Sequence, residues 1–382
     1  MGNCITLCLS VLLGSGVCTI ADEEPVYKGR PVREWLWQLK SPKIAERSAA
    51  VREFGPEAIV CVPAIIEALR FESLEFHDNS CNPEPRRWLA GACGRVGPEA
   101  VPLFRKALRD PWPSIRGWSA FILAHMPDET GESAAEVVGL LKDQDPGVRR
   151  LAAIAVSRMG KNTEAATAAL VEALKDEDAE VRSRAAAILG WRGSQDLLPV
   201  LAGLLNDPSS RVRQSVVRVL ACYGRQAVPH LMRALKDPDA RVRQDAAHQI
   251  HELGPVASEA VEELIKVLTS DSDRDVRFGA AAAIGGLGPR AKVAVPALIE
   301  ALKLEDRFVL DAVIRALGQI GPEAKAAVPA LEELLQNQEK LYPPPQQWLR
   351  QDRDIEKALG KINCQSSKTC VEYLDPSSGW QL

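Results

Sequence analysis

The sequence predicts an all-α fold, a solenoid built from about ten two-helix repeats. The first support is internal repetition, because the segments EVRSRAAAILGWRG, RVRQDAAHQIHELG and DVRFGAAAAIGGLG share one pattern. Each occurs beside an aspartate-rich turn and an apolar stretch such as VPALIEALK. The second is composition: 46% of residues are hydrophobic and 26% charged, but only 5% are aromatic. That balance is typical of helices that pack through small side chains, and it argues against a large β-barrel or sandwich.

The repeats keep a nearly constant length. They align on the arginine of a Val-Arg pair or its equivalent, with Glu46 and Leu310 standing in at the two ends: Arg86, Arg116, Arg149, Arg182, Arg213, Arg243 and Arg277. The successive gaps are 40, 30, 33, 33, 31, 30, 34 and 33 residues. A last, degenerate unit is indicated because IEKALGKI, from Ile355, repeats VIRALGQI, from Val313. The solenoid is therefore expected to span residues 22–363.

Each repeat is predicted to hold two helices, A and B. Helix A often carries proline in its first turn, where the missing N–H costs nothing: Pro63, Pro102, Pro199, Pro229, Pro296 and Pro329. Helix B begins after a residue of capping type, four positions before the aligned residue: Asn82, Asp145, Asp178, Ser209, Asp239, Asp273 and Asp306. It ends at a glycine that is expected to be left-handed and is followed by proline: Gly55, Gly97, Gly254, Gly288 and Gly321.

The N-terminus is typical of a signal peptide at residues 1–21. Gly2 to Ala21 has no charged residue, its centre is apolar, and small residues at Thr19 and Ala21 suit cleavage after Ala21. Export to the periplasm or the extracellular space follows, with no membrane span left in the mature chain. The alternative is anchoring to a membrane through the N-terminus, either as a retained span or by acylation at Gly2 and Cys4.

Six of the nine cysteines remain after such a cleavage. In an oxidising compartment we expect a bridge between Cys364 and Cys370, because both lie in a polar tail, residues 364–382, and are close in sequence. Cys61, Cys93 and Cys222 are expected to be buried as small apolar side chains.

The block D-x-D-x-x-V-R-x-x-A-A-x-x-L-G-x-x-G, seen with small departures at Asp239 to Gly254 and Asp271 to Gly288, resembles HEAT repeats of the phycobilin-lyase-like class. The opening YKGRPVREWLWQLKS resembles the first helix of exported bacterial HEAT-repeat proteins. The resemblance implies a ladder that ties adjacent repeats together through turn aspartates and Val-Arg arginines: Asp176, Asp237, Asp271, Arg149, Arg182, Arg213, Arg243 and Arg277. It also implies an alternative function, a regulatory or chaperone-like lyase subunit.

Structural roles are expected for the recurring acids. Each D-x-D pair lacks the third ligand, the turn glycine and the distal glutamate of a calcium loop, so capping is favoured over calcium binding, with Asp145, Asp178, Asp239 and Asp273 as the caps. His248, His251 and Glu252 are spaced as metal ligands within one helix, but no other repeat carries such a set. No nucleophile elbow, phosphate loop or zinc-protease motif occurs. A non-enzymatic chain without metal or cofactor is predicted.

Recognition by the concave face is the leading functional hypothesis. In helix B, the exposed stripe is expected one or two, five and nine residues after the aligned position. It includes Arg87, Trp88, Arg95, Trp118, His125, Arg150, Arg158, Arg184, Trp191, Arg218, His248 and Arg315. Tryptophan and arginine carry much of the energy of protein interfaces. The expected partner is a protein or peptide. An anionic polymer is the alternative, and the net charge of −4 argues against nucleic acid. The competing interpretation is that these long side chains only cover neighbouring repeats.

Overall fold

The computed structural model describes residues 25–72, 74, 85–126, 132–159, 164–304, 306–341 and 348–363. The predicted signal peptide, the tail with Cys364 and Cys370, and the capping residue Asn82 lie outside these residues. Contacts group the chain into two compact units, Met1–Lys161 and Asn162–Leu382. The described helices form ten A/B pairs, four in unit 1 and six in unit 2, so the predicted all-α solenoid is confirmed.

Unit 1 opens with a short antiparallel hairpin, β1 (Val26–Tyr27) and β2 (Arg30–Pro31), which the sequence did not predict. Its A helices are α2 (Val32–Leu39), α4 (Val62–Ala68), α6 (Val101–Ala107) and α8 (Glu132–Gly139). Its B helices are α3 (Ile44–Glu53), α5 (Pro85–Val96), α7 (Pro113–Leu123) and α9 (Pro146–Arg158), and successive B helices pack on one another. The hairpin closes the first repeat, because the Trp35 indole donates to the Tyr27 carbonyl at 2.9 Å. Trp37, on the same helix, is 70% exposed.

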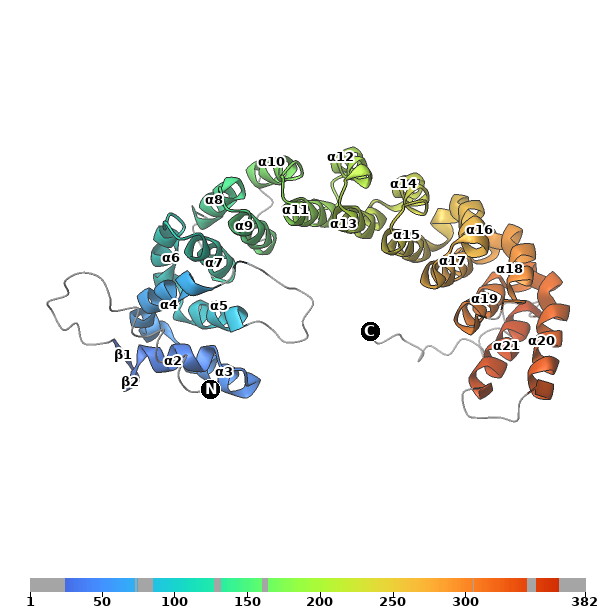
Figure 1. The fold of residues 1–382 in the computed structure, drawn as a ribbon, viewed down its shortest axis with the longest axis horizontal. Helices are drawn as coiled ribbons and strands as arrows, with labels where there is room; N and C mark the ends of the chain where they lie inside the picture. The colour runs from blue at the N-terminus through green and yellow to red at the C-terminus, as the bar shows by residue number, and fades with distance from the viewer. Residues whose placement is uncertain are drawn as a thin grey trace. The chain divides into compact units, whose positions relative to one another are not determined.

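Unit 2 repeats the same arrangement, and Figure 1 shows A helices in one layer and B helices in the other. Its A helices are α10 (Glu164–Ala173), α12 (Leu198–Gly203), α14 (Val228–Ala234), α16 (Val261–Ser270), α18 (Val295–Ala301) and α20 (Val328–Leu341). Its B helices are α11 (Ala179–Trp191), α13 (Ser210–Leu220), α15 (Ala240–Leu253), α17 (Arg274–Gly286), α19 (Arg307–Ile320) and α21 (Trp348–Asn363). Short 3₁₀ turns link many B helices to the next A helix, for example Gly254–Ala260 and Gly288–Ala294.

Helix boundaries follow local sequence signals, with two exceptions. Asp145 and Asp178 each accept hydrogen bonds from two backbone N–H groups at the start of α9 and α11. Gly254 ends α15 at φ +57° and ψ −139°, a conformation that side chains disfavour. Ser209, expected to cap α13, makes no side-chain cap. Gly55 is extended rather than left-handed, at φ −150°.

Small residues on helix B let neighbouring repeats approach closely. Ala246 and Ala247 of α15, like Ala280 and Ala281 of α17, are fully buried where these helices meet. A Cβ added to Gly190 of α11 would overlap the side chain of Val219 in α13. The core of unit 2 is therefore formed where neighbouring repeats pack together, since neither helix of a repeat could bury its apolar side alone.

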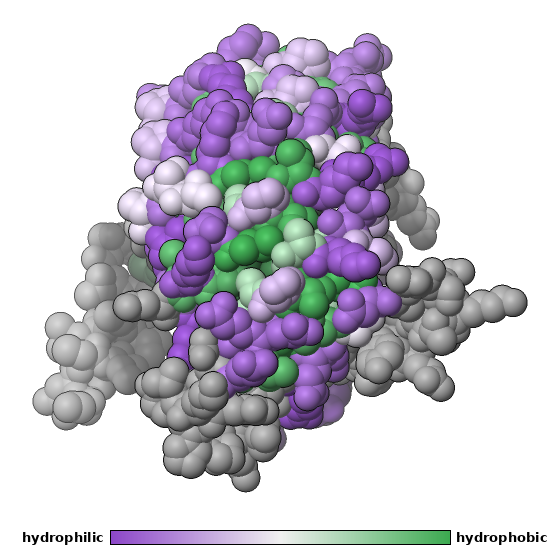
Figure 2. Space-filling model, turned by 90° about the vertical axis from the view of Figure 1, so that its right-hand side faces the viewer, coloured by the Kyte–Doolittle hydropathy of each residue, from purple (hydrophilic) through white to green (hydrophobic). Residues whose placement is uncertain are grey.

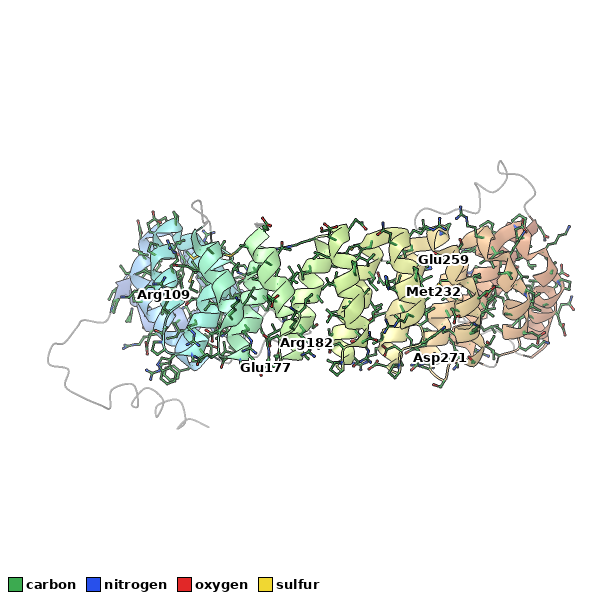
Figure 3. All side chains as sticks on the ribbon, turned by 90° about the horizontal axis from the view of Figure 1, so that it is seen from above. Arg109, Glu177, Arg182, Met232, Glu259 and Asp271 are labelled. Carbon is green, nitrogen blue, oxygen red and sulfur yellow. The ribbon has the colours of Figure 1, made fainter. Side chains whose placement is uncertain are left out.

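A ladder of arginine and aspartate runs along the edge where A helices turn into B helices. Arg213 donates from Nε and Nη2 to both carboxylate oxygens of Asp237 in the next repeat, at 2.7 and 2.8 Å. Its Nη1 also donates to the Asp207 carbonyl in its own repeat, at 2.8 Å. The same two-bond pairing joins Arg182–Asp207, Arg243–Asp271 and, in unit 1, Arg116–Asp143. Arg277 donates to Asp306 from Nη2, at 3.3 Å. Figure 3 shows Glu177, Arg182 and Asp271 along this edge, with Glu259 toward the other edge.

The ladder corrects the alignment of the first repeat. Every ladder arginine donates to the carbonyl six residues before it, as Arg149 does to Asp143 at 3.0 Å. In the first repeat, this bond is made by Arg47 to the Ser41 carbonyl, and Arg47 is buried. The equivalent position is therefore Arg47, where the sequence comparison placed Glu46.

Candidate functional site

The candidate site is the exposed face of the B helices in unit 2, which we call the B face. Positions five and nine after the ladder arginine are one helical turn apart, so they share one side of the helix. The buried residues that pack against other repeats, such as Val216, Val217 and Leu220 in α13, lie on another side of the helix. The exposed side chains at positions five and nine are Trp191, Arg218, Cys222, His248, Glu252 and Gln319. Trp191 is 72% exposed, an unusual state for the largest apolar side chain.

Three predicted contact residues in unit 1 are used by the fold instead. Trp118 is only 1% exposed and packs on Phe121 with ring centres 5.4 Å apart, so it was wrongly placed on the exposed stripe. Trp88 is half-buried, with the Arg47 guanidinium 5.5 Å from its ring. Arg95 is exposed, but its Nε donates at 3.0 Å to the Phe54 carbonyl at the end of α3.

The remaining unit 1 positions are also engaged or only partly exposed. His125 is half-buried, and its Nδ1 donates to the Phe121 carbonyl of its own helix at 2.8 Å. Arg158 is exposed, with its guanidinium 5.8 Å from the Phe121 ring. Arg150 is half-buried, and the side chain of Arg87 lies outside the described residues. The predicted stripe is therefore most accessible in unit 2.

Polar contacts connect neighbouring helices across the B face. Arg218 of α13 pairs with Asp245 of α15 at 3.1 Å, and Arg211 of α13 pairs with Glu180 of α11 at 2.6 Å. Arg184, a predicted contact residue, is occupied by the same Glu180 at 2.7 Å. Burial raises the pKa of the Asp245 carboxyl, although the Arg218 charge acts against it. These bonds hold the B helices in register without covering Trp191 or His248.

The histidines of α15 point to different surroundings. His248 is exposed, whereas the Nδ1 of His251 lies 3.0 Å from the Ala282 carbonyl of α17. A carbonyl only accepts, so the proton of neutral His251 is on Nδ1 and only Nε2 is left to accept a bond or bind a metal. Within the described residues, no three His, Cys, Asp or Glu side chains gather as a group suited to a metal ion.

The alignment of the repeats did not identify an aromatic pair that lies on the B face. Phe278 of α17 and Phe308 of α19 are stacked, with ring centres 4.3 Å apart and an interplanar angle of 22°. Phe308 is 48% exposed. Arg274 lies 5.5 Å from the Phe308 ring, and Arg315 lies 6.0 Å from the Phe278 ring. Phe278 directly follows Arg277 and so occupies a stripe position, although the predicted stripe comprised only tryptophan, arginine and histidine residues.

A polar surface pocket of about 440 Å³ lies on the ladder edge between α14 and α16. Its charged lining is internally paired. Lys236 and Lys266 both contact Glu263, at 3.3 and 3.0 Å, and Arg243 and Asp271 form a ladder rung. Since the pairs already compensate one another, the pocket offers little net charge to a ligand.

Apolar side chains also gather on the side of unit 2 where α18 and α20 lie, as Figure 2 shows. Val293, 55% exposed, is in the 3₁₀ turn that leads into α18. Within the described residues, nothing identifies a partner for this apolar surface. Along the described part of the chain, no helix is both long and apolar enough to cross a membrane.

Comparison with known families agrees with this architecture. Residues 101–178, 167–251 and 261–342 match the family model described as HEAT repeats, and together they make up more than half of the chain. The chain is a HEAT-repeat protein. The search of curated proteins found no significant match to it.

Several solved structures resemble the chain in fold. Kap95p, which binds RanGDP, is 15% identical with a TM-score of 0.61, over 91% of this chain and 50% of Kap95p. Importin beta is 14% identical with a TM-score of 0.58, over 90% of this chain and 54% of importin beta. The Escherichia coli protein YibA is 21% identical with a TM-score of 0.51, over 76% of this chain and 100% of YibA. The HEAT-repeat chain thus spans about half the length of the first two proteins.

Proposed function

We propose that this HEAT-repeat protein is a non-enzymatic scaffold that binds another protein or a peptide through the B face of unit 2. The observation that carries the proposal is that recurring charged side chains pair within the fold, whereas charged and aromatic side chains that do not recur are exposed. Arginines that recur in the repeats, such as Arg213 and Arg243, form the ion pairs of the ladder. Residues that differ from repeat to repeat, such as Trp191 and His248, remain exposed.

The chemistry of the B face suits an interface. Tryptophan and arginine bury large surfaces and form directional bonds, and they dominate the binding energy of protein interfaces. The ladder fixes each repeat on the next, so the B helices present their side chains from a rigid support. A rigid support reduces the conformational entropy that is lost on binding, and so favours affinity.

The test is a retention experiment with residues 22–382 immobilised on a resin and extract of the native host. The triple variant Trp191→Ala, Arg218→Glu, His248→Glu is compared with wild type. The control Val200→Ala, Arg225→Glu, Lys292→Gln makes the same formal charge change at exposed positions outside the B face. We expect discrete proteins to be retained by wild type and control and lost by the B-face variant. Retention of the same proteins by all three chains would refute the proposal.

Binding of an anionic polymer is the rival that the exposed arginines Arg211 and Arg241 favour. It predicts an affinity that falls steeply with salt, because neutralised anionic groups release counterions. Repeating the retention at two salt concentrations separates the two. A protein partner stays bound at moderate salt, whereas a polymer is released.

Export is also part of the proposal, although residues 1–21 lie outside the described part of the chain. We expect the mature protein in its native host to begin at Asp22, and an intact mass with N-terminal sequencing measures this. A chain that keeps its first 21 residues would contradict export by signal-peptide cleavage.

A further inference from the structure

The stacked phenylalanines Phe278 and Phe308 contribute little to the core of unit 2. Phe308 lies in the first turn of α19, and 48% of its surface is exposed. The buried side of the same helix is formed by other residues, including Val309 and Val313. An aromatic ring on a folded surface leaves its apolar face in water, which is unfavourable unless a partner covers it.

Two arginines border this pair from different helices. Arg274, from the start of α17, is 5.5 Å from the Phe308 ring, and Arg315, from the middle of α19, is 6.0 Å from the Phe278 ring. The Nε of Arg315 donates to the Asp311 carbonyl at 3.1 Å, which fixes the direction of its side chain. We call these four residues the Phe-Arg platform: Phe278, Phe308, Arg274 and Arg315.

The charge around the platform is positive. Arg274 and Arg315 belong to the platform, and Arg307 adjoins Phe308. The acids within the same two helices are Asp275, 3.7 Å from Arg274, and Asp311, so these arginines outnumber the acids by three to two. Asp273 and Asp306 precede the helices and are engaged as their caps. A ligand that matches this surface carries negative charge beside an aromatic group.

We propose that the Phe-Arg platform binds an acidic peptide segment that lays an aromatic side chain on the Phe278–Phe308 stack. Guanidinium groups bind carboxylates through paired hydrogen bonds, and a further ring stacks on an exposed ring face. Single-stranded nucleic acid shares part of this chemistry. The peptide is favoured because Asp275 and Asp311 lie within the same patch and would repel a continuous phosphate chain, whereas peptide carboxylates are spaced by neutral residues. This inference rests on the proposed function and names the partner chemistry for one part of the B face.

The test is a selection of random peptides displayed on phage against residues 22–382, followed by fluorescence anisotropy with the enriched peptides. We expect enriched sequences that combine an aromatic residue with neighbouring Asp or Glu. Phe308→Ser with Arg274→Gln should weaken their binding by roughly tenfold or more, the loss typical of an interface hot spot. Phe308→Leu, which keeps apolar volume but removes the ring, should weaken binding as well. The control Val200→Ser with Arg225→Gln should leave it unchanged, and thermal melts verify that all variants fold.

The possible outcomes separate this inference from the proposed function. If peptides bind but only Trp191→Ala with Arg218→Glu weakens them, the B face is a binding surface and the platform is not part of it. If neither pair of changes weakens them, both proposals fail. Selection that yields no aromatic-acidic sequences overturns the platform proposal. So does tighter platform-dependent binding of a poly(dT) oligonucleotide, which would assign the platform to nucleic acid.

Discussion

Each ladder arginine bonds to two repeats at once, and so couples the stability of one repeat to that of the next. The guanidinium of Arg213 holds the Asp237 carboxylate of the next repeat and the Asp207 carbonyl of its own. Its planar fork makes these bonds from one rigid group, which a lysine ammonium does not reproduce. A ladder position is therefore sensitive even to the conservative change to lysine.

Replacing Arg213 by methionine should lower the free energy of unfolding by about 3 kcal/mol, because a nearly buried Asp237 loses its partner. Urea unfolding followed by circular dichroism measures this. Arg241→Met, at an exposed arginine two residues before the ladder arginine Arg243, is the matched control and should change stability by less than about 0.5 kcal/mol. Equal effects of the two changes would show that the ladder adds nothing to stability.

The ladder also predicts a pH dependence. Burial alone would raise the pKa of the Asp207 carboxyl, but hydrogen bonds from Arg182 and from the Ser209 N–H outweigh burial and hold this pKa below its ordinary value. A carboxyl whose pKa is lowered by folding stabilises the protein at pH above its unfolded pKa, and the gain is lost as pH falls through the folded pKa.

We therefore expect the melting temperature of wild type to fall as pH drops below about 4, the ordinary range of aspartate. Asp207→Asn should melt at a lower temperature at neutral pH and lose less on acidification. Thermal melts across this range measure both. Parallel loss in wild type and variant would mean that other groups control the acid response.

At the scale of elements, small residues of helix B set the distance between repeats. A Cβ on Gly190 would overlap Val219, while one on Gly203, at the end of α12, would meet nothing within 4 Å. Gly190→Ala should destabilise unit 2 by about 1–3 kcal/mol through overpacking. Gly203→Ala should stabilise it by about 0.5–1 kcal/mol.

Adding Val219→Ala to Gly190→Ala should recover part of the loss, since it opens the space that the new methyl group needs. Chemical unfolding of the two single variants and the double variant measures the coupling. Strict additivity of the two changes would contradict direct contact between these positions.

Helix order, starts and ends were predictable because their signals are local. Proline in the first turn of helix A and aspartate before helix B act within a few residues of the boundary they mark, as at Pro229 and Asp239. The first repeat was misaligned because it carries Ala-Glu-Arg where later repeats carry Val-Arg. Only the bond from Arg47 to the Ser41 carbonyl identifies its register.

Exposure was less predictable, because it depends on residues distant in sequence. Leu74, between α4 and α5, packs against Gly117 of α7 and Gly147 of α9 and so covers part of the B helices of unit 1. Leu74 lies outside the repeat pattern, so the pattern does not predict this contact. Trp118, beside Gly117, was therefore wrongly expected to be exposed. Cys222 shows the opposite case, since it was expected to be buried and is exposed.

At the scale of the whole molecule, repetition specifies the fold and departures from repetition indicate function. The shared ladder, caps and alanines build the HEAT-repeat stack. The unshared residues Trp191, His248 and Phe308 make its B face chemically distinct. A protein that only stacked repeats would not need a 72% exposed tryptophan.

The most direct measurement of this claim is photo-crosslinking in the native host, with p-benzoylphenylalanine in place of His248 on the B face or of Val200 on helix A α12. Both positions are exposed, so both variants are expected to fold. Our account predicts a discrete adduct with a second protein from position 248 and none from position 200. Adducts from position 200 alone would place the binding surface on the A helices and contradict the account.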